Sequence, residues 1–243
     1  MISQTISGKI QSIIKLNNYI YGVNLKINGP FLFKAGQFIS YFINDKQARA
    51  YSIASSPRLA IDKNELNLIV GPHPGGDSEK YYQNAKVGDE CQFRGPFGIF
   101  TMEKTLPIYN SNEFNSERSI VYIATSTGIA PFLSMIEYLA DIGYKNKIVL
   151  YFGVRYQEDI FLLDVFEDLK KRLNFTYYIC ISKPSNDLQE SENIKFGYVT
   201  ENVIKYQNNE DYCYICGSTV NVQSISTKLN ESNFKNVYFE NYG

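Results

Sequence analysis

The segment "SIVYIATSTGIAP", residues 119–131, marks a change in the spacing of hydrophobic residues along the chain. It begins with an apolar run typical of a buried strand and passes through a Thr-x-x-Gly-x-x-Pro turn. It then leads into residues 130–144, whose apolar positions recur at helical spacing. A strand followed closely by a helix is the unit from which helix-covered parallel sheets are built. Residues 119–243 are therefore predicted to form an α/β domain.

The same alternation continues beyond this unit. Further strands are predicted at 147–154, 176–182, 212–218 and 236–242, with helices within 160–174, 200–206 and 222–229. In an open parallel sheet the ligand lies beyond the carboxyl ends of the strands. Four segments follow strands in this way and are expected to share one edge: "TSTGIAP" (125–131), "GVR" (153–155), "SK" (182–183) and "CGS" (216–218).

The turn at 125–131 has features of a phosphate site. Gly128 permits close approach of a ligand to the backbone, and Pro131 suits the first turn of a helix. Free N–H groups and the helix dipole would then point at an anion. The turn predicts a dinucleotide pyrophosphate site without the G-x-G-x-x-G fingerprint, and the alternative is an ordinary tight strand-to-helix connection.

Residues 1–103 follow a different pattern. Short runs of alternating apolar residues, at 23–27, 36–43 and 66–70, are separated by clusters of Gly, Pro, Asn and Asp. This pattern predicts an antiparallel barrel or sandwich. The polar, aperiodic segment 104–118 is predicted to link it to the α/β domain.

Within the first domain, "RAYSIASSP" (49–57) reads as a strand running into a turn. Arg49 shares one side of that strand with Tyr51 and Ile53, so it needs a partner. An arginine, an aromatic ring and hydroxyls in this order suit a flavin nucleotide, through a phosphate contact, ring stacking and hydrogen bonds. The order R-x-Y-S-x-x-S resembles the FAD signature of the ferredoxin–NADP reductase superfamily.

The resemblance continues in order along the chain, through "GGDSEKY" (75–81), "VGDECQFRGPFGIF" (87–100), "STGIAP" (126–131), "YICGS" (214–218) and "FENYG" (239–243). It implies a two-domain β plus α/β fold. An N-terminal antiparallel Greek-key β-barrel would bind FAD, and a C-terminal parallel-sheet α/β domain would bind NADP(H), with NADH possible.

The resemblance also implies roles for particular residues. FAD would be bound by Arg49, Ala50, Tyr51, Ser52, Gly75, Gly76 and Ser78. The nicotinamide nucleotide would be bound by Thr127, Gly128, Arg155, Ser182, Lys183, Cys216 and Gly217. Ser52, Cys216 and Glu240 would lie by the reacting rings, and Tyr242 would cover the flavin until nicotinamide displaces it.

Each of these roles has a structural alternative. Tyr51 suits a core aromatic, Cys216 a small apolar filler, and Glu240 a surface carboxylate. Lys183 suits a solvated loop. Ser126 departs from the family, which usually has glycine there, and its extra Cβ is expected to restrict the approach of the nucleotide.

Composition limits the classes of partner. The 24 basic and 25 acidic residues nearly cancel, which argues against nucleic acid or an anionic membrane as the main partner. No apolar stretch approaches the roughly 20 residues that span a bilayer, so the protein is expected to be cytoplasmic. Four cysteines are too few for a disulfide framework. Cys213 and Cys216 lie three apart on a strand and are expected to face opposite ways, which argues against one shared metal.

The sequence contains no C-x4-C-x2-C set for an iron–sulfur centre, so electrons are expected to leave to a separate acceptor. The first interpretation is a ferredoxin or flavodoxin reductase that uses NADPH. The second is the reductase component of an oxygenase or a reductase of free flavin. The third is an electron-transfer subunit of a larger complex.

Overall fold

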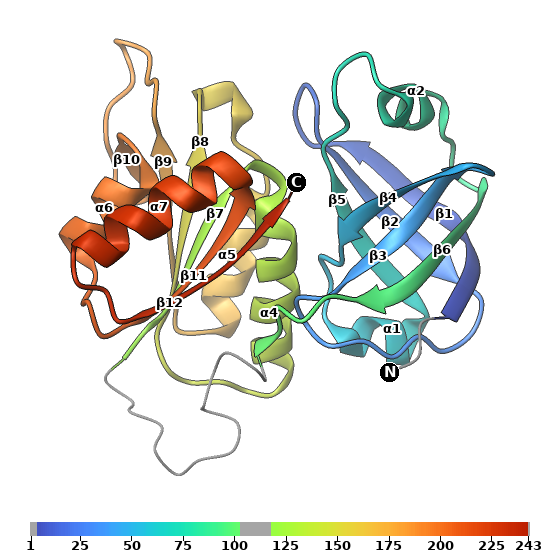
Figure 1. Ribbon diagram of the computed structural model, residues 1–243, viewed down its shortest axis with the longest axis horizontal. Coiled ribbons are helices and arrows are strands. Elements are labelled where there is room, and N and C mark those ends of the chain that lie inside the picture. The colour runs from blue at the N-terminus through green and yellow to red at the C-terminus, as the bar shows by residue number, and fades with distance from the viewer. Residues whose placement is uncertain (1–3, 103–117, 243) are drawn as a thin grey trace. The chain divides into compact units, whose positions relative to one another are not determined.

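The computed structural model describes residues 4–102 and 118–242, which form two compact units (Figure 1). The first unit contains the chain up to Met102 together with Ala130–Ile142, and the second contains the rest. The expected linker at 104–118 lies outside the described residues, apart from Arg118.

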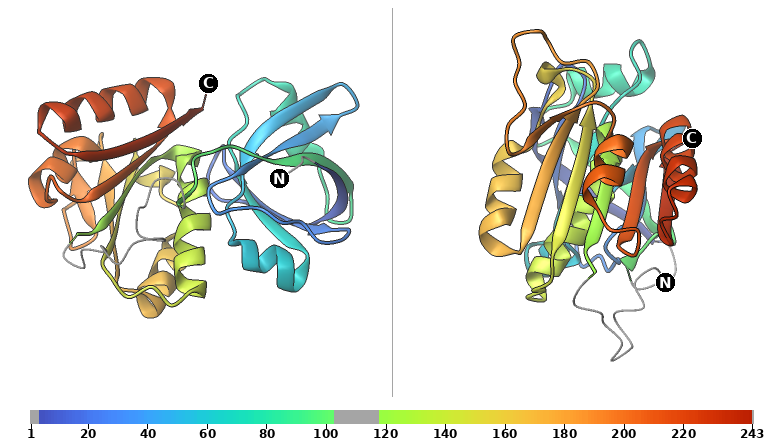
Figure 2. Two further views of the ribbon diagram at one scale, coloured as in Figure 1. Left: turned by 60° about the horizontal axis from the view of Figure 1, so that its bottom comes forward. Right: turned by 90° about the vertical axis from the view of Figure 1, so that its left-hand side faces the viewer.

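The first unit is built on a six-stranded antiparallel sheet in the order β4-β3-β6-β1-β2-β5. The bounds are β1 (Gln4–Lys15), β2 (Tyr21–Ile27), β3 (Phe38–Asn44), β4 (Gln47–Ser52), β5 (Glu65–Val70) and β6 (Glu90–Phe97). An isolated antiparallel bridge between Ile53 and Leu68 joins the two edge strands, so the sheet closes into the predicted barrel (Figure 2).

Alternation of side chains fills the inside of this barrel. In β1 the buried positions are Ile6, Gly8 and Ile10, separated by exposed residues. Two helices that the sequence did not predict complete the unit, α1 (Pro57–Lys63) after β4 and α2 (Asp77–Asn84) after β5. The core also contains several tyrosines, which become important for the site.

Helix α4 (Ile129–Asp141) belongs mainly to this first unit, although it follows β7 in sequence. Ser134 Oγ donates a hydrogen bond to the carbonyl of Ser55 at 2.7 Å, and the Phe132 ring lies 6.2 Å from that of Phe100. The helical spacing that predicted α4 is confirmed, and its contacts with the barrel are a finding of the structure.

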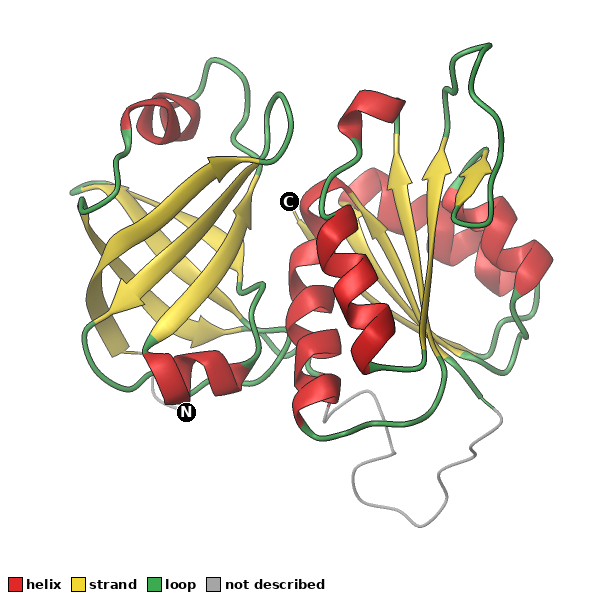
Figure 3. Ribbon diagram, turned by 180° about the vertical axis from the view of Figure 1, so that it is seen from behind, coloured by secondary structure: helices red, strands yellow, loops and turns green. Residues whose placement is uncertain are grey.

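The second unit is a parallel sheet in the order β10-β9-β8-β7-β11-β12, with helices on both faces (Figure 3). Its strands are β7 (Ile120–Thr125), β8 (Ile148–Val154), β9 (Phe175–Ile181), β10 (Ile194–Phe196), β11 (Tyr212–Ser218) and β12 (Asn236–Tyr242). The α/β prediction is confirmed, while β10, only three residues long, was not predicted.

The helices of this unit divide between the two faces of the sheet. α6 (Val199–Tyr206) and α7 (Thr219–Glu231) pack their apolar residues against Val121, Val149 and Ile215. On the opposite face α5 (Leu163–Arg172) places Phe166 against Phe152, with ring centroids 6.0 Å apart. Among the described residues, no helix is both long and apolar enough to cross a membrane.

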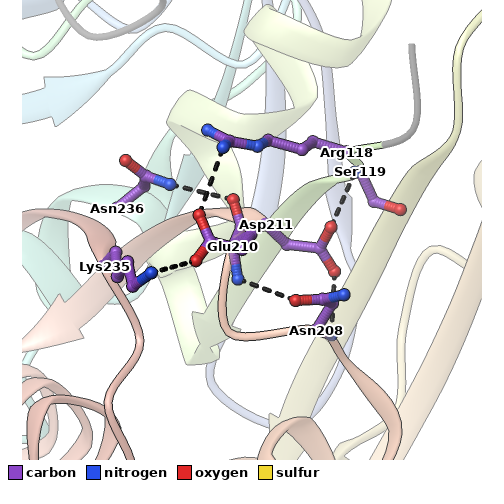
Figure 4. Close-up of polar contacts among 7 residues, drawn as sticks. All are labelled: Arg118, Ser119, Asn208, Glu210, Asp211, Lys235 and Asn236. Carbon is purple, nitrogen blue, oxygen red and sulfur yellow. Dashed lines mark hydrogen bonds and ion pairs between the residues drawn. The ribbon is translucent and has the colours of Figure 1, made fainter. Parts of the chain in front are cut away.

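A polar network joins the segments that enter the central strands at their amino ends (Figure 4). Glu210 pairs with Arg118 at 3.1 Å and also with Lys235. Asp211 accepts hydrogen bonds from the backbone N–H groups of Ser119 and Asn208, at 2.8 and 3.1 Å. These contacts fix the start of β7 beside β11 and β12, which in turn fixes where the opposite, carboxyl ends of the strands lie.

Candidate functional site

Strand β4 presents Arg49 and Tyr51 on one side, as the sequence predicted. In the antiparallel pair with β3, Arg49 lies opposite Tyr41 and Tyr51 lies opposite Ile39, and both partners point into the barrel. The Arg49 guanidinium is exposed and donates a hydrogen bond to the carbonyl of Ala48 at 3.0 Å. Within residues 4–102 and 118–242 no carboxylate pairs with it. Its charge is therefore open to an anionic ligand.

Tyr51 is half-buried, and its ring lies 6.1 Å from that of Tyr41 and 6.0 Å from that of Tyr82. Burial raises the pKa of the Tyr51 phenol, and the nearby Tyr82 and Ser78 side chains and the Arg49 charge partly offset that rise. The buried hydroxyls of Tyr51 and Tyr82 have no hydrogen-bond partner among the described residues.

These two hydroxyls test whether the strand fits a flavin nucleotide. A buried hydroxyl without a partner is costly, and a ligand that supplies oxygen acceptors would remove that cost. The phosphates and sugar hydroxyls of FAD are such acceptors, and Arg49 lies on the same strand. Strand β4 also contains two other residues predicted to bind FAD. Ser52 is buried at the end of the strand, and Ala50 is exposed on its other side.

The predicted phosphate loop leads into α2. The Gly75 N–H donates to the Glu79 carboxylate at 2.7 Å, and the Gly76 N–H donates to the carbonyl of His73 at 3.0 Å. Gly75 adopts φ 76°, which a residue with a Cβ rarely does. The glycines therefore shape the turn, and their amides are already engaged, while Ser78 is buried behind them.

In the second unit the order in which the chain adds strands reverses between β7 and β11, which are parallel neighbours. The chain places β8, β9 and β10 on one side of β7, and β11 and β12 on the other. Open α/β sheets bind ligands at such a switch point, outside the carboxyl ends of the strands. The four segments predicted to share one edge all lie at this edge, because the strands that precede them are parallel neighbours.

Two glycines allow the strand ends at the switch point to pack closely. A Cβ on Gly128, in the 3₁₀ turn η2 (Ser126–Gly128), would collide with the carbonyl of Cys216. A Cβ on Gly217 would collide with the hydroxyl of Thr125. Both predicted positions therefore have a packing reason to be glycine. Thr127 lies in the same turn, half-buried.

Ser126 begins this turn in a left-handed conformation, with φ 53°, and its side chain is exposed. This is the backbone region that favours glycine. The position where the family usually has glycine thus keeps a glycine-like conformation while carrying a serine.

Farther along the edge, two backbone hydrogen bonds tie the end of β9 to that of β8. Ser182 N–H donates to the carbonyl of Val154 at 3.1 Å, and Lys183 N–H donates to that of Arg155 at 2.9 Å. The Arg155 guanidinium lies over the Tyr156 ring, 5.3 Å from its centroid. Arg155 and Lys183 are exposed, so two cations lie on neighbouring strand ends.

Cys216 and Glu240 are directly opposite each other on β11 and β12. Burial raises the pKa of the Cys216 thiol to about 12; the Glu240 charge adds to the rise, and a hydrogen bond with Tyr242 opposes it. Cys213 packs into the core on the other face, so the two thiols point in opposite directions as predicted.

Glu240 is not a surface carboxylate. Burial raises the pKa of its side chain from 4.5 to about 7, and its Oε2 atom is buried without a partner among the described residues. Tyr242 is opposite Ser218, and its carbonyl accepts a hydrogen bond from Thr219 Oγ1 at 3.2 Å. A carboxyl with a raised pKa, a neutral thiol and a tyrosine thus gather at the switch-point end of β11 and β12.

The sequence did not single out two groups at these sites. Tyr82 contributes the second hydroxyl beside Tyr51, and Asn221 donates to Thr125 Oγ1 at 3.2 Å. Asn221 follows "CGS" by three residues, at the first turn of α7, so proximity to that motif was the one available indication.

Comparison with known families agrees with this division of the chain. Residues 8–102 match the family described as "Oxidoreductase FAD-binding domain", and residues 122–226 match "Oxidoreductase NAD-binding domain". The chain belongs to the ferredoxin–NADP reductase superfamily. Its two domains are those with which this superfamily binds FAD and a pyridine nucleotide.

Curated relatives within this superfamily include electron-transfer proteins. The chain is 28% identical over 217 residues to the toluate 1,2-dioxygenase electron transfer component of Pseudomonas putida, covering 86% of this chain and 59% of the relative. It is 28% identical over 235 residues to the phenol hydroxylase P5 protein of Acinetobacter pittii, covering 94% of this chain and 62% of the relative. The chain thus spans about three fifths of these relatives.

Solved structures share the superfamily's fold at low identity. A cytochrome P450 reductase of Amycolatopsis aligns with a TM-score of 0.83 at 20% identity, covering 98% of this chain and 70% of that one. The ferredoxin–NADP⁺ reductase of Plasmodium falciparum aligns with a TM-score of 0.71 at 23% identity, covering 98% and 96%. These likenesses support the two-domain fold.

Proposed function

We propose that this protein is an NAD(P)H-dependent flavoprotein reductase that passes electrons to a separate one-electron carrier, with a ferredoxin or flavodoxin as the first candidate. The observation that carries the proposal is β4, where, among the described residues, Arg49 has no carboxylate partner and the buried hydroxyl of Tyr51 has no hydrogen-bond partner. When bound, FAD supplies the conversion of a two-electron hydride into single electrons. Residues 1–103 would act as the FAD domain and 119–243 as the nucleotide domain, joined by 104–118.

In this proposal the barrel holds and orients the flavin. Arg49 binds a phosphate through charge-assisted hydrogen bonds, and the Tyr51 ring packs against the isoalloxazine. Ser52 donates a hydrogen bond at the ring edge, and Ser78 contributes to the phosphate contact. Gly75 and Gly76 hold the loop in shape rather than donate their amides.

The edge of the parallel sheet holds the nicotinamide nucleotide. Thr127 and the turn closed by Gly128 would face the pyrophosphate, while Ser182, Lys183 and Arg155 would face the adenosine end. A hydroxyl and two cations suit a 2′-phosphate, so we propose NADPH over NADH. Lysine lacks the bidentate fork of arginine, which makes Lys183 the weaker of the two cations.

Cys216, Glu240 and Tyr242 complete the nucleotide side. With a pKa near 7, Glu240 holds and releases a proton close to neutral pH, whereas the Cys216 thiol stays neutral and offers a small uncharged surface. Tyr242 would occupy the place of the nicotinamide at rest. Ser52 and Cys216 would then act at the reacting rings without changing charge.

A second candidate, the reductase component of an oxygenase, is favoured by the similarity to such components, among them the toluate 1,2-dioxygenase electron transfer component. A free-flavin reductase, or an electron-transfer subunit of a larger complex, remains the further alternative. In each case we propose a cytoplasmic protein that acts on carriers rather than on nucleic acid or membranes.

One experiment tests the proposal and separates the candidates. The purified protein should be yellow with one FAD per chain, and NADPH should bleach it faster than NADH. Ferredoxin, flavodoxin, an oxygenase component and free FMN are then compared as acceptors by kcat/KM. A colourless protein that takes up no added flavin would overturn the assignment, and a preference for NADH would overturn the choice of nucleotide.

A further inference from the structure

We infer that the outer edge of β12 pairs with β12 of a second copy of this chain, in antiparallel orientation about a two-fold axis at Phe239, so that two parallel sheets join into one. Strand β12 (Asn236–Tyr242) is the last strand of its sheet, and among the described residues it pairs only with β11 (Figure 1). Its outer side therefore presents backbone N–H and C=O groups that can pair with another strand. The inference does not rest on the flavin assignment.

The opposite edge of the same sheet, strand β10, is protected against such pairing. It is only three residues long, and its central residue is a lysine. The N–H of Ile194 donates to Ser191 Oγ at 3.2 Å, and that of Phe196 donates to Glu190 Oε1 at 2.8 Å. Side chains of the preceding loop thus occupy two backbone donors of this edge strand.

Strand β12 has none of these protections. It is seven residues long and contains no proline, lysine or arginine. Its register with β11 is continuous from Asn236 to Tyr242, so no bulge turns the edge away from a partner. Glu240 is its one charged residue. A long, regular and weakly charged edge is suited to the addition of a further strand.

The order of residues along β12 identifies the partner as a second copy. Phe239 is the fourth of the seven residues, and its side chain is 56% exposed. In an antiparallel pair centred on it, each Phe239 lies opposite the other, so each exposed ring is covered by its own counterpart. Val237 then lies opposite Asn241, and Glu240 lies opposite Tyr238, so the two carboxylates do not meet. The edge is therefore complementary to itself in both apolar surface and charge, which is what a two-fold interface requires.

Sedimentation of the purified full-length protein over a range of concentrations measures the pairing. We expect two chains per particle at high concentration and dissociation on dilution. Phe239→Lys should raise the dissociation constant by about tenfold or more, because it places two like charges directly opposite each other. Ile14→Lys is the matched control, since Ile14 is an apolar strand residue of the barrel that is 57% exposed, and it should behave as the parent does. A parent that stays monomeric at every concentration, or equal weakening by both variants, would overturn the inference.

A mixture of two charged variants tests the position of the axis. Phe239→Glu alone should also be monomeric, for the same reason as Phe239→Lys. An equimolar mixture of the two should restore the dimer, because residue 239 of one copy faces residue 239 of the other and the charges are then opposite. If both variants show the unfolding transition of the parent and their mixture stays monomeric, pairing about Phe239 is wrong.

An uncharged variant provides a test that does not depend on repulsion. The four cysteines of the chain are all buried, so Phe239→Cys adds the one exposed thiol. Directly opposite Cβ atoms of an antiparallel pair are close to the separation that a disulfide needs. Oxidation with diamide should therefore link two chains of Phe239→Cys, as seen on a non-reducing gel, and should link far fewer in Ile14→Cys. Equal linking in the two variants would overturn the inference, whatever flavin the protein carries.

Discussion

Strand β4 of the barrel and the switch-point edge of the parallel sheet present opposite chemistry. Among the described residues, the exposed Arg49 of β4 has no carboxylate partner, and the buried hydroxyls of Tyr51 on β4 and Tyr82 on α2 have no hydrogen-bond partner. At the switch point Cys216 is buried and Glu240 is half-buried, and burial raises the pKa of both. The first arrangement favours permanent attachment of an anionic ligand. The second places a neutral thiol and a carboxyl that titrates near neutral pH beside a ligand that comes and goes.

Arg49→Ala should remove the exposed cation of β4 from the barrel and produce the largest effect of the changes considered. Loss of charge-assisted hydrogen bonds to a phosphate, worth about 1.5 to 3 kcal/mol each, should weaken flavin binding by at least tenfold. Folding should be unaffected, because the side chain is exposed. Flavin content and the dissociation constant of the purified variant measure the effect.

Arg58→Ala is the matched control, since Arg58 is also exposed and pairs with Asp62 on the same helix. It should keep its flavin. If Arg49→Ala bound flavin as tightly as this control, the open cation of β4 would have no role in attachment.

Glu240→Gln tests the switch-point edge of the parallel sheet, through the dependence of the free energy of unfolding on pH. The pKa of Glu240 is raised on folding from 4.5 to about 7, so the carboxyl contributes stability that is fully present below pH 4.5 and lost as the pH rises through 7. The shift corresponds to up to about 3 kcal/mol. Glutamine stays neutral, so the variant should be more stable than the parent at pH 8 and similar to it at pH 4.5.

Denaturant unfolding of both proteins at several pH values measures this difference. A parallel pH dependence in the two proteins would mean that Glu240 titrates normally and that the sheet edge is not built around a neutral carboxyl. The same variants give a second measurement, since the rate of flavin reduction by NADPH should lose its dependence on a group with a pKa near 7 in Glu240→Gln.

Gly128→Ala should show how strictly the switch point is packed. The added Cβ would meet the carbonyl of Cys216, which is backbone and cannot rotate away. We expect a loss of about 1 to 3 kcal/mol in the free energy of unfolding, together with weaker nucleotide binding, because the turn must move. Gly143→Ala tests the same change in open space, at φ 70°, where only backbone strain applies.

The architecture was predictable where one local pattern decides it. Runs such as residues 120–124 are apolar at every position because both faces of a parallel sheet are covered, and the alternation of buried and exposed residues in β1 fills the inside of the barrel. Arg49 and Tyr51 share a side because strand geometry fixes alternate residues. The edge shared by Gly128 and Cys216 follows from the direction of parallel strands.

What the sequence did not predict depends on contacts distant along the chain. The rings of Tyr51 and Tyr82 come together only once α2 packs near β4. The amides of Gly75 and Gly76 are engaged by Glu79 and His73 through the path of one turn, which composition does not specify. The burial of Glu240 was left open because β12 has no clear alternation.

Ser126→Gly gives the smallest expected effect, and it tests whether the Ser126 side chain restricts binding of the nucleotide at the switch point. Ser126 has φ 53°, a conformation that costs a non-glycine residue about 1 kcal/mol, so glycine should stabilise the second unit by about that amount. If the Cβ also restricts the nucleotide, Ser126→Gly should bind NADPH more tightly, whereas Ser126→Ala, which keeps the Cβ and loses the hydroxyl, should bind it as the parent does. Weaker binding in both variants would contradict this expectation, because it would mean that the exposed hydroxyl contacts the ligand. In that case the switch point would attach its ligand with polar groups as the barrel does, and the contrast between the two regions would be limited to Cys216 and Glu240.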